Sequence, residues 1–215
     1  MDGKRITKLT VQKNDQERIN IFLDDTFAFG LSRIIGERLR IGQVLTQPEI
    51  DKLLSEDLDE TIRKRALSYL SRRARSENEL RKELLKNGYE EKRIDNAIAE
   101  LRNSHLLNDE AFSNDWVENR NSLHPRSQRL IALELRHKGI TEEIIQESLK
   151  NADDDQTAYD LGSRYSRRLA GLKWPDFRKR LSNHLAGKGY DYGVITRVVR
   201  QIWNENEHSA EDSLS

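Results

Sequence analysis

The segment LRKELLKNGY at residues 80–89 decides the fold of this chain, because it recurs as IALELRHKGI at residues 131–140 and as LSNHLAGKGY at residues 181–190. In every copy two apolar residues lie four positions apart, which places both on one face of a helix. A glycine follows, and glycine readily adopts the left-handed conformation that ends a helix. The copies recur about every 50 residues, which predicts a structural repeat of that length.

Each copy continues into a second predicted helix. A capping-type residue starts this helix in two copies, Thr141 and Asp191, whereas Glu90 in the first copy is a poorer cap. Apolar pairs four residues apart would face the first helix of each copy; they are Ile94 and Ile98, Ile145 and Leu149, and Ile195 and Val199. Each copy is therefore a helix, a glycine stop and a second helix.

One more amphipathic stretch precedes every copy, around Tyr69, Trp116 and Tyr165. The signals that separate it from the copy are the capping pair Ser76 and Glu79, the His124-Pro125 step and the Trp174-Pro175 step. We therefore predict a mainly α-helical protein, an elongated tandem array of three three-helix repeats. Helical spacing assigns the aromatic and aliphatic residues to core packing.

The first sixty residues differ in kind. Residues 5–11 and 18–23 partly alternate apolar and polar side chains, and residues 26–29 follow a polar turn, so we predict a small antiparallel β-meander of three strands. A helix that starts at Pro48 follows it. A sheet of this size is marginal alone, so we interpret it as a subdomain that caps the array. Its open strand edge leaves a second role as an interaction surface.

Charge alternates along the predicted segments, although Lys plus Arg equal Asp plus Glu at 37 each. The segments and their net charges are 1–60 for the sheet and helix (−3), 61–108 for the first repeat (+5), 109–155 for the second (−5), 156–205 for the third (+6) and 206–215 for an acidic flexible tail (−3). Two basic repeats flanking an acidic one suit a partner of mixed charge, such as a protein filament that carries nucleic acid.

Basic residues cluster near the ends of two predicted helices and at the start of another. They are Arg72, Arg73 and Arg75 in the first repeat, and Arg164, Arg167, Arg168, Arg178, Lys179 and Arg180 in the third. The helix dipole favours cations at a C-terminus, so a solvated surface explains some of them. Contact with phosphate or with an acidic partner is the other explanation, and phosphate contacts would make binding salt-dependent. We take these residues as candidate contacts.

Composition excludes several classes of protein. The absence of cysteine excludes a disulfide framework and a thiolate zinc site. No apolar run is long enough to span a membrane, and the N-terminus has no signal-peptide pattern. With 34% charged residues and a mean hydropathy of −0.85, we expect a soluble cytoplasmic protein that has no membrane partner.

Catalytic and metal-binding patterns are missing from the sequence. The five histidines include no pair four residues apart, and no glycine-rich phosphate loop or nucleophile motif is present. The run Asp153-Asp154-Asp155 lacks the glycine and terminal glutamate of a calcium loop, so we interpret it as a linker or helix cap. We therefore predict a protein that is not an enzyme and needs no cofactor or metal.

Several motifs occur in a specific order. They are Tyr69-Leu70-Ser71-Arg72-Arg73, Ser76 with Glu79-Leu80, the run LNDEAF at residues 107–112, Trp116-Val117 with Arg120, and Lys138-Gly139-Ile140. In this order and spacing the chain resembles the RecX family, the regulators of the RecA recombinase. The resemblance covers about residues 61–205, and the N-terminal strands look like those of the longer family members.

The resemblance implies both a partner and a role. RecX-like proteins lie along the groove of the RecA filament on single-stranded DNA and alter its growth and disassembly. The chain would then modulate recombinase, ATPase and co-protease activity in DNA repair, recombination and the SOS response, and inhibition is the direction that we favour. We expect it to act as a monomer, and direct contact with single-stranded DNA stays open.

Two other classes of function remain open. A tandem helix-turn-helix DNA-binding protein would fit the short turns between paired helices, but the corresponding helix of the second repeat begins with the acidic residues Glu142 and Glu143. A helical-repeat scaffold for protein partners would bind through a concave face without DNA. Titration against RecA with and without single-stranded DNA, and against duplex DNA, separates the three.

Overall fold

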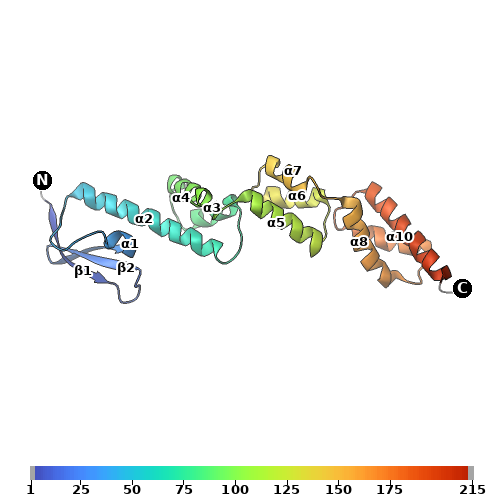
Figure 1. Cartoon of the computed structure of the whole chain (residues 1–215), viewed down its shortest axis with the longest axis horizontal. Coiled ribbons are helices and arrows are strands. Elements are labelled where there is room, and N and C mark those ends of the chain that lie inside the picture. Colours follow the sequence, from blue (N-terminus) through green and yellow to red (C-terminus); the bar gives the residue numbers. More distant parts are fainter. Residues whose placement is uncertain (1–2, 213–215) are drawn as a thin grey trace. The chain divides into compact units, whose positions relative to one another are not determined.

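The computed structural model describes the backbone of residues 3–212 and the side chains of residues 3–207. Figure 1 shows the helices and strands in their order along the chain, and contacts between residues divide the chain into two compact units. Compact unit 1 comprises Met1–Arg75 and Leu80–Leu107, and compact unit 2 comprises Ser76–Glu79 and Asn108–Ser215. The first turn of helix α3 (Glu77–Lys86) therefore belongs to the second unit and the rest of that helix to the first.

Compact unit 1 begins with a four-stranded antiparallel sheet in the order β3-β2-β1-β4. Its strands are β1 (Lys4–Val11), β2 (Arg18–Leu23), β3 (Thr26–Ser32) and β4 (Val44–Leu45). The predicted antiparallel meander is confirmed as β1 to β3. Strand β4 is an addition, because two residues are too few to produce an alternating pattern that sequence reasoning can detect.

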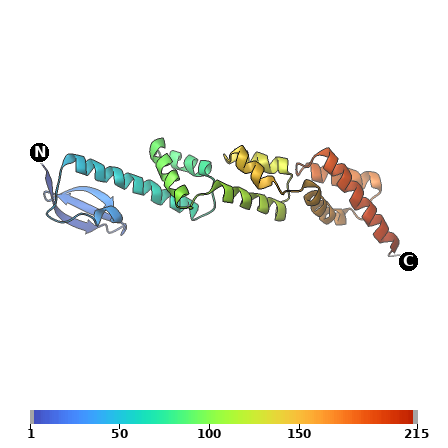
Figure 2. The same ribbon diagram turned by 45° about the horizontal axis from the view of Figure 1, so that its top comes forward.

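A long helix connects the sheet to the first repeat. After the short α1 (Arg33–Gly36), helix α2 (Gln47–Leu70) begins at Thr46, whose capping box with Glu49 closes the first turn. Figure 2 shows the first half of α2 against the sheet, where Ile50 joins the core of the strands. The second half contributes Ile62 and Ala66 to the core of the first repeat. The helix is thus continuous across residues 60 and 61, where we placed a segment boundary.

Three helices form the first repeat: the end of α2, α3, and α4 (Glu91–Asn103). The repeated apolar residues Leu80, Leu84, Ile94 and Ile98 are all buried in its core. Burial of each such side chain contributes about 1.5–3 kcal/mol, so the repeated phrase is mainly a packing signal.

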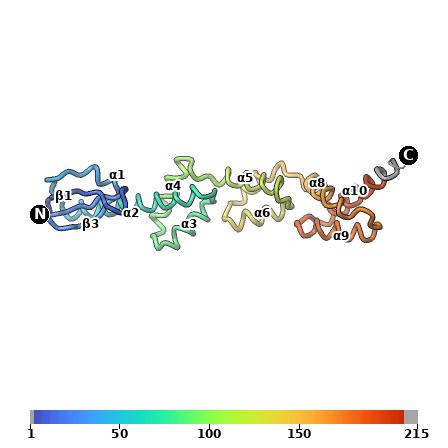
Figure 3. Tube along the Cα trace, turned by 90° about the horizontal axis from the view of Figure 1, so that it is seen from below, coloured from blue at the N-terminus to red at the C-terminus, as the bar shows by residue number. Residues whose placement is uncertain are grey.

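Compact unit 2 contains two further three-helix repeats. The second repeat consists of α5 (Asp109–Ser122), α6 (Gln128–His137) and α7 (Glu142–Leu149). The third consists of α8 (Asp154–Ser166), the short 3-10 helix η1 (Arg167–Leu169), α9 (Trp174–Ala186) and α10 (Tyr192–Asp212). Figure 3 shows α8, α9 and α10 side by side, and each of the three contacts the other two. The predicted mainly helical class with three three-helix repeats is confirmed.

Helix α10 continues to Asp212, so residues 206–212 of the expected flexible tail are helical. The reason is that extending a helix adds one hydrogen bond per residue without the cost of a new nucleus. Hydrogen bonds at Glu205, from Gln201 and from Tyr159, hold the preceding turn. Residues 213–215 of the expected tail lie outside the described residues.

No helix within the described residues is long and apolar enough to cross a membrane.

Candidate polyanion and partner interface

The same junction occurs twice within compact unit 2. At the start of α3, the Ser76 hydroxyl donates to the carbonyl oxygen of Lys138 at 2.6 Å. At the start of α6, the Ser127 amide donates to the carbonyl oxygen of Lys188 at 3.0 Å. Each junction thus joins the first turn of one helix to the turn that ends another, 62 and 61 residues later.

Aspartates complete both junctions. Asp109 accepts the Glu77 amide at 2.8 Å, and Asp154 accepts the Gln128 amide at 2.8 Å. These carboxylates satisfy amides that the first turn of a helix leaves without partners, and they suit the positive end of the helix dipole. Burial raises the pKa of Asp154, and this effect outweighs the opposing effect of the Gln128 hydrogen bond.

At these junctions Gly139 and Gly189 leave no room for a side chain. A Cβ atom on Gly139 would lie 2.4 Å from Cβ of Asn78, and one on Gly189 would lie 2.7 Å from Oγ of Ser127. Both glycines also have a positive φ, of 81° and 90°. The corresponding space at Gly88 is open, with no described atom within 4 Å.

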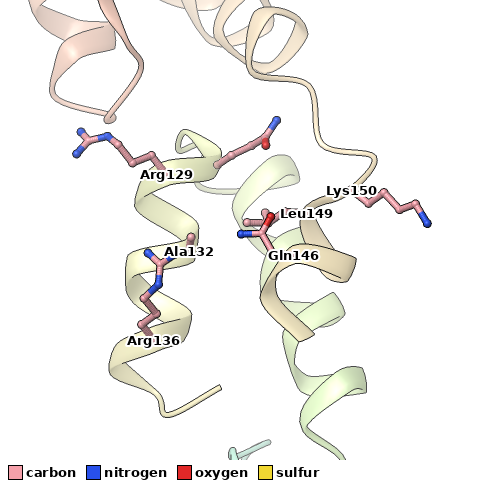
Figure 4. Close-up of a pocket in the computed structure, with 7 residues that line it drawn as sticks. Arg129, Ala132, Arg136, Gln146, Leu149 and Lys150 are labelled. Atoms are coloured by element: carbon pink, nitrogen blue, oxygen red, sulfur yellow. The ribbon is translucent and has the colours of Figure 1, made fainter. Parts of the chain in front are cut away.

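Between the second and third helices of the second repeat lies a groove of about 370 Å³, the α6/α7 groove. It is lined by Gln128, Arg129, Ala132, Arg136, Gln146, Leu149 and Lys150. In Figure 4, Gln146 points from α7 toward α6, whereas Arg129 and Lys150 extend away from the groove.

The third repeat carries a larger groove of about 710 Å³ at the same position, the α9/α10 groove. Adding 50 to each lining residue of the α6/α7 groove gives Arg178, Lys179, Ser182, Ala186, Thr196, Val199 and Arg200, and all seven line the second groove. Trp174, Pro175, Asn183, Tyr192 and Ile195 extend its lining. The two grooves are therefore one feature of the repeat, built twice.

Carboxylates neutralise cations of the α6/α7 groove. Glu142 accepts two hydrogen bonds from Arg136, both at 2.9 Å, and the pair raises the pKa of Arg136 and lowers that of Glu142. Glu147 lies 3.3 Å from Nζ of Lys150. Each of these cations thus has an acidic neighbour within its own repeat.

Among the described side chains, the cations of the α9/α10 groove lack the neighbouring carboxylates that the second repeat provides. Tyr192 stands where the second repeat has Glu142, and Arg197 stands where it has Glu147. Arg197 makes two hydrogen bonds to Asp155, at 2.9 and 2.8 Å, so the Asp155 carboxylate pairs with Arg197 and not with a cation of the groove. The exposed cations of the groove have no ion pair or side-chain hydrogen bond within residues 3–207; they are Arg178, Lys179 and Arg200. This groove is therefore a basic site without internal neutralisation.

In the first repeat an ion pair crosses the equivalent space between the second and third helices. Arg81 and Asp95 occupy the positions of Ala132 and Gln146, and they form an ion pair between α3 and α4. The three repeats therefore share a backbone plan but differ in the charge of this surface.

The predicted contacts of the first repeat lie on the loop that follows α2. Arg72 and Arg73 are exposed. Arg75 is half-buried, and its guanidinium carbon lies 5.2 Å from the centre of the Tyr69 ring. Arg75 therefore has a packing role, whereas Arg72 and Arg73 are exposed, and Arg73 Nη1 donates to the Ala74 carbonyl oxygen at 2.9 Å.

The predicted contacts of the third repeat do not form one patch. Only Arg178 and Lys179 line the α9/α10 groove. Arg164, Arg167, Arg168 and Arg180 are exposed elsewhere on α8, η1 and α9. Sequence reasoning missed Trp174, Tyr192 and Arg200 as members of the site, and aligning the repeats with an offset of 50 would have found Arg200 opposite Lys150.

A second basic region surrounds His184. Its ring stacks on Tyr165 with centres 3.9 Å apart. Burial lowers the pKa of His184, and the positive charges of Lys188 and Arg168 lower it further. Arg168 thus belongs to the region between α8 and α9, apart from the α9/α10 groove lining.

The three consecutive aspartates have structural roles in the fold. Asp153 caps α8 by accepting the amides of Asp155 and Gln156. Asp154 and Asp155 accept the Gln128 amide and the Arg197 guanidinium described above. Among the described side chains, no group of three His, Cys, Asp or Glu residues could hold a metal ion.

The antiparallel sheet and the three three-helix repeats together define a tandem helical-repeat protein. Family models match the chain over most of its length: the regulatory protein RecX N-terminal domain at residues 4–46, and the first, second and third RecX three-helix domains at residues 63–101, 108–149 and 153–199. The chain therefore belongs to the RecX family of regulatory proteins, and the resemblance seen in its sequence is confirmed.

Individual relatives agree. The chain is 30% identical over 211 residues to the regulatory protein RecX of Bacillus licheniformis, covering 96% of this chain and 80% of the relative. It is also 30% identical over 207 residues to the RecX protein of Clostridium botulinum, covering 93% and 97%. A crystal structure of a regulatory protein RecX is similar with a TM-score of 0.72 and 25% identity, covering 91% of this chain and 98% of that one.

Proposed function

We propose that this chain binds the RecA filament on single-stranded DNA and inhibits its ATPase, strand exchange and co-protease activities. The observation that carries the proposal is the match to all four RecX domains along the chain. RecA is the partner that the family resemblance implies.

The surface of the chain supports a filament as partner. Compact unit 1 presents Arg72 and Arg73 on an exposed loop, and compact unit 2 presents the basic α9/α10 groove. The second repeat has a net charge of −5 and pairs two cations of its groove, Arg136 and Lys150, with carboxylates. Several separate contacts of modest strength give high avidity on a repeating partner.

Duplex recognition by tandem helix-turn-helix units is less well supported. Glu142 and Glu143 stand in the first turn of α7, where a recognition helix would enter the negatively charged major groove and contact base edges. Glu142 is also held by Arg136, which leaves neither side chain available to read a base edge.

The ATPase of RecA on single-stranded DNA tests the proposal. We expect the wild-type chain to lower the steady-state rate at substoichiometric amounts, because a groove-bound protein affects several protomers. The double variant Arg72→Gln with Arg73→Gln should need about tenfold more protein for half inhibition. A control variant with the same charge change is Lys82→Gln with Lys92→Gln, two exposed lysines of the same repeat. An unchanged ATPase at saturating wild-type protein would contradict the proposal.

A further inference from the structure

We propose that the α9/α10 groove is a binding site for single-stranded DNA. The inference deepens the proposed function, on which it rests for its biological setting, by assigning the strand a site on this chain. The site itself needs no recombinase, because all of its residues belong to the third repeat.

Positive charge reaches this groove from both walls. Arg178 and Lys179 stand on α9, and Arg200 stands on α10. Within residues 3–207, no carboxylate lines the groove and none pairs with these three cations. Such a site attracts a polyanion, because each phosphate that it binds releases a condensed counterion.

Comparison with the other repeats shows that this charge is not a general property of the fold. At the same position the second repeat pairs Arg136 with Glu142, and the first repeat pairs Arg81 with Asp95. In the third repeat Tyr192 replaces the glutamate. The substitution removes a negative charge and adds an aromatic ring at one place.

Aromatic rings lie at both ends of the groove. Tyr192 begins α10 and is 75% exposed. Trp174 begins α9 and packs on Trp203, near the middle of α10, with ring centres 5.3 Å apart. Because a short loop joins the end of α9 to the start of α10, these two rings stand near opposite ends of α9. Rings beside cations are the arrangement that single-stranded nucleic acid uses, with bases stacked and phosphates paired.

The shape of the site favours a single strand over a duplex. Duplex readers insert a protruding helix or ribbon into the major groove, whereas this site is a hollow of about 710 Å³ between two helices. Its floor of Ile195 and Val199 is buried and apolar, which suits the faces of unpaired bases. An acidic protein segment would meet the same cations, but it would not need the exposed ring of Tyr192.

Fluorescence anisotropy of a labelled oligo(dT) with the full chain, without RecA, tests the site. We expect Arg178→Gln with Arg200→Gln to raise the Kd at least tenfold. It should also reduce the slope of log K against log salt by about 1.4, since each phosphate contact on a single strand contributes about 0.7. Tyr192→Ala should raise the Kd about fivefold and leave that slope unchanged, because stacking involves no counterion.

The matched control uses the equivalent groove of the second repeat. Arg136→Gln with Lys150→Gln removes the same amount of charge, and we expect the Kd to stay within twofold. Conversely, Glu142→Tyr with Glu147→Gln removes the two carboxylates that pair with Arg136 and Lys150 and adds the ring that Tyr192 supplies in the third repeat, so it should tighten binding. Circular dichroism verifies that each variant is folded.

Several results would overturn the inference. They are no binding of oligo(dT) by the wild-type chain at low salt, an equal loss in the control and the test variant, or equal affinity for duplex DNA of the same length. Displacement of a weakly held oligo(dT) by an acidic peptide of equal charge at lower concentration would assign the groove to a protein partner instead. Oligo(dT) binding with an unchanged RecA ATPase would overturn the proposed function but leave this site standing.

Discussion

Gly189 packs so closely on Ser127 that a Cβ atom at Gly189 would lie 2.7 Å from the Oγ of Ser127. The φ of Gly189 is 90°, so any other residue would also be strained. We therefore predict that Gly189→Ala lowers the free energy of unfolding of compact unit 2 by about 2–3 kcal/mol, of which the left-handed backbone accounts for about 1–2.

Thermal denaturation of the full chain measures this effect. Gly88→Ala is the matched control, because Gly88 has a φ of 80° but no described atom within 4 Å of its missing Cβ. The control should lose only the backbone contribution of about 1–2 kcal/mol. Equal losses of unfolding free energy in the two variants would show that the close approach of Gly189 to Ser127 does not contribute to the cost of Gly189→Ala.

Asp57 is the buried link between α2 and the sheet. Its carboxylate accepts the Ser32 amide at 2.5 Å and Arg18 Nη2 at 2.9 Å, and the residue is 7% exposed. Asp57→Ala would leave both donors without this partner, so we predict a loss of about 2–3 kcal/mol in urea denaturation. Asp59→Ala, which removes an exposed ion pair with Arg93, should cost at most about 1 kcal/mol. Similar costs would contradict the assigned role of Asp57.

Lys138 contacts two kinds of partner, an aromatic ring of the second repeat and a carboxylate in the first turn of α3. Its ammonium lies 4.0 Å from the centre of the Trp116 ring and 3.0 Å from the Glu79 carboxylate. Lys138→Met keeps the apolar stem but removes the charge, so we predict a loss of about 1–2 kcal/mol. Lys150→Met, at a side chain that is 66% exposed, should change stability by less than about 0.5 kcal/mol in the same urea titration.

Acid should destabilise the third repeat through His184. Because its pKa is below the ordinary value of 6.5 in the folded chain, the unfolded chain binds the proton more tightly. The stabilisation is complete above about pH 6.5 and is lost as the pH falls through the folded pKa. His184→Phe retains an aromatic ring to stack on Tyr165 and does not titrate.

Melting curves between pH 5 and pH 7.5 provide the measurement. The difference in Tm between the wild type and His184→Phe should shift in favour of the variant as the pH falls. A difference that is constant over this range would show that the imidazole titrates alike in the folded and unfolded chains.

Much of the fold followed from short-range pattern. The repeated leucines and isoleucines are buried where their spacing placed them, and the three glycines all adopt a positive φ. Strand β4 escaped prediction because two residues carry no periodicity, and its pairing with β1 joins residues about forty positions apart. The division into five segments stays a prediction, although the first of its boundaries falls within the continuous helix α2.

The candidate site followed from the sequence only in part. The sequence located the excess of positive charge in the third repeat, and two of its basic residues, Arg178 and Lys179, line the α9/α10 groove. The remaining predicted arginines of that repeat lie outside the groove lining, because a helix turns successive residues by about 100° and spreads a run of cations over several faces.

Periodicity alone determined which residues form the core of each helix, because a helical face is set by residues three and four positions apart. The availability of each cation depended on partners that only folding brings near. Arg197 meets Asp155 across 42 positions of sequence, whereas Arg178 and Arg200 meet no carboxylate within the described side chains. Three cations line each of the two grooves, but carboxylates pair with two of them in the second repeat and, among the described side chains, with none in the third.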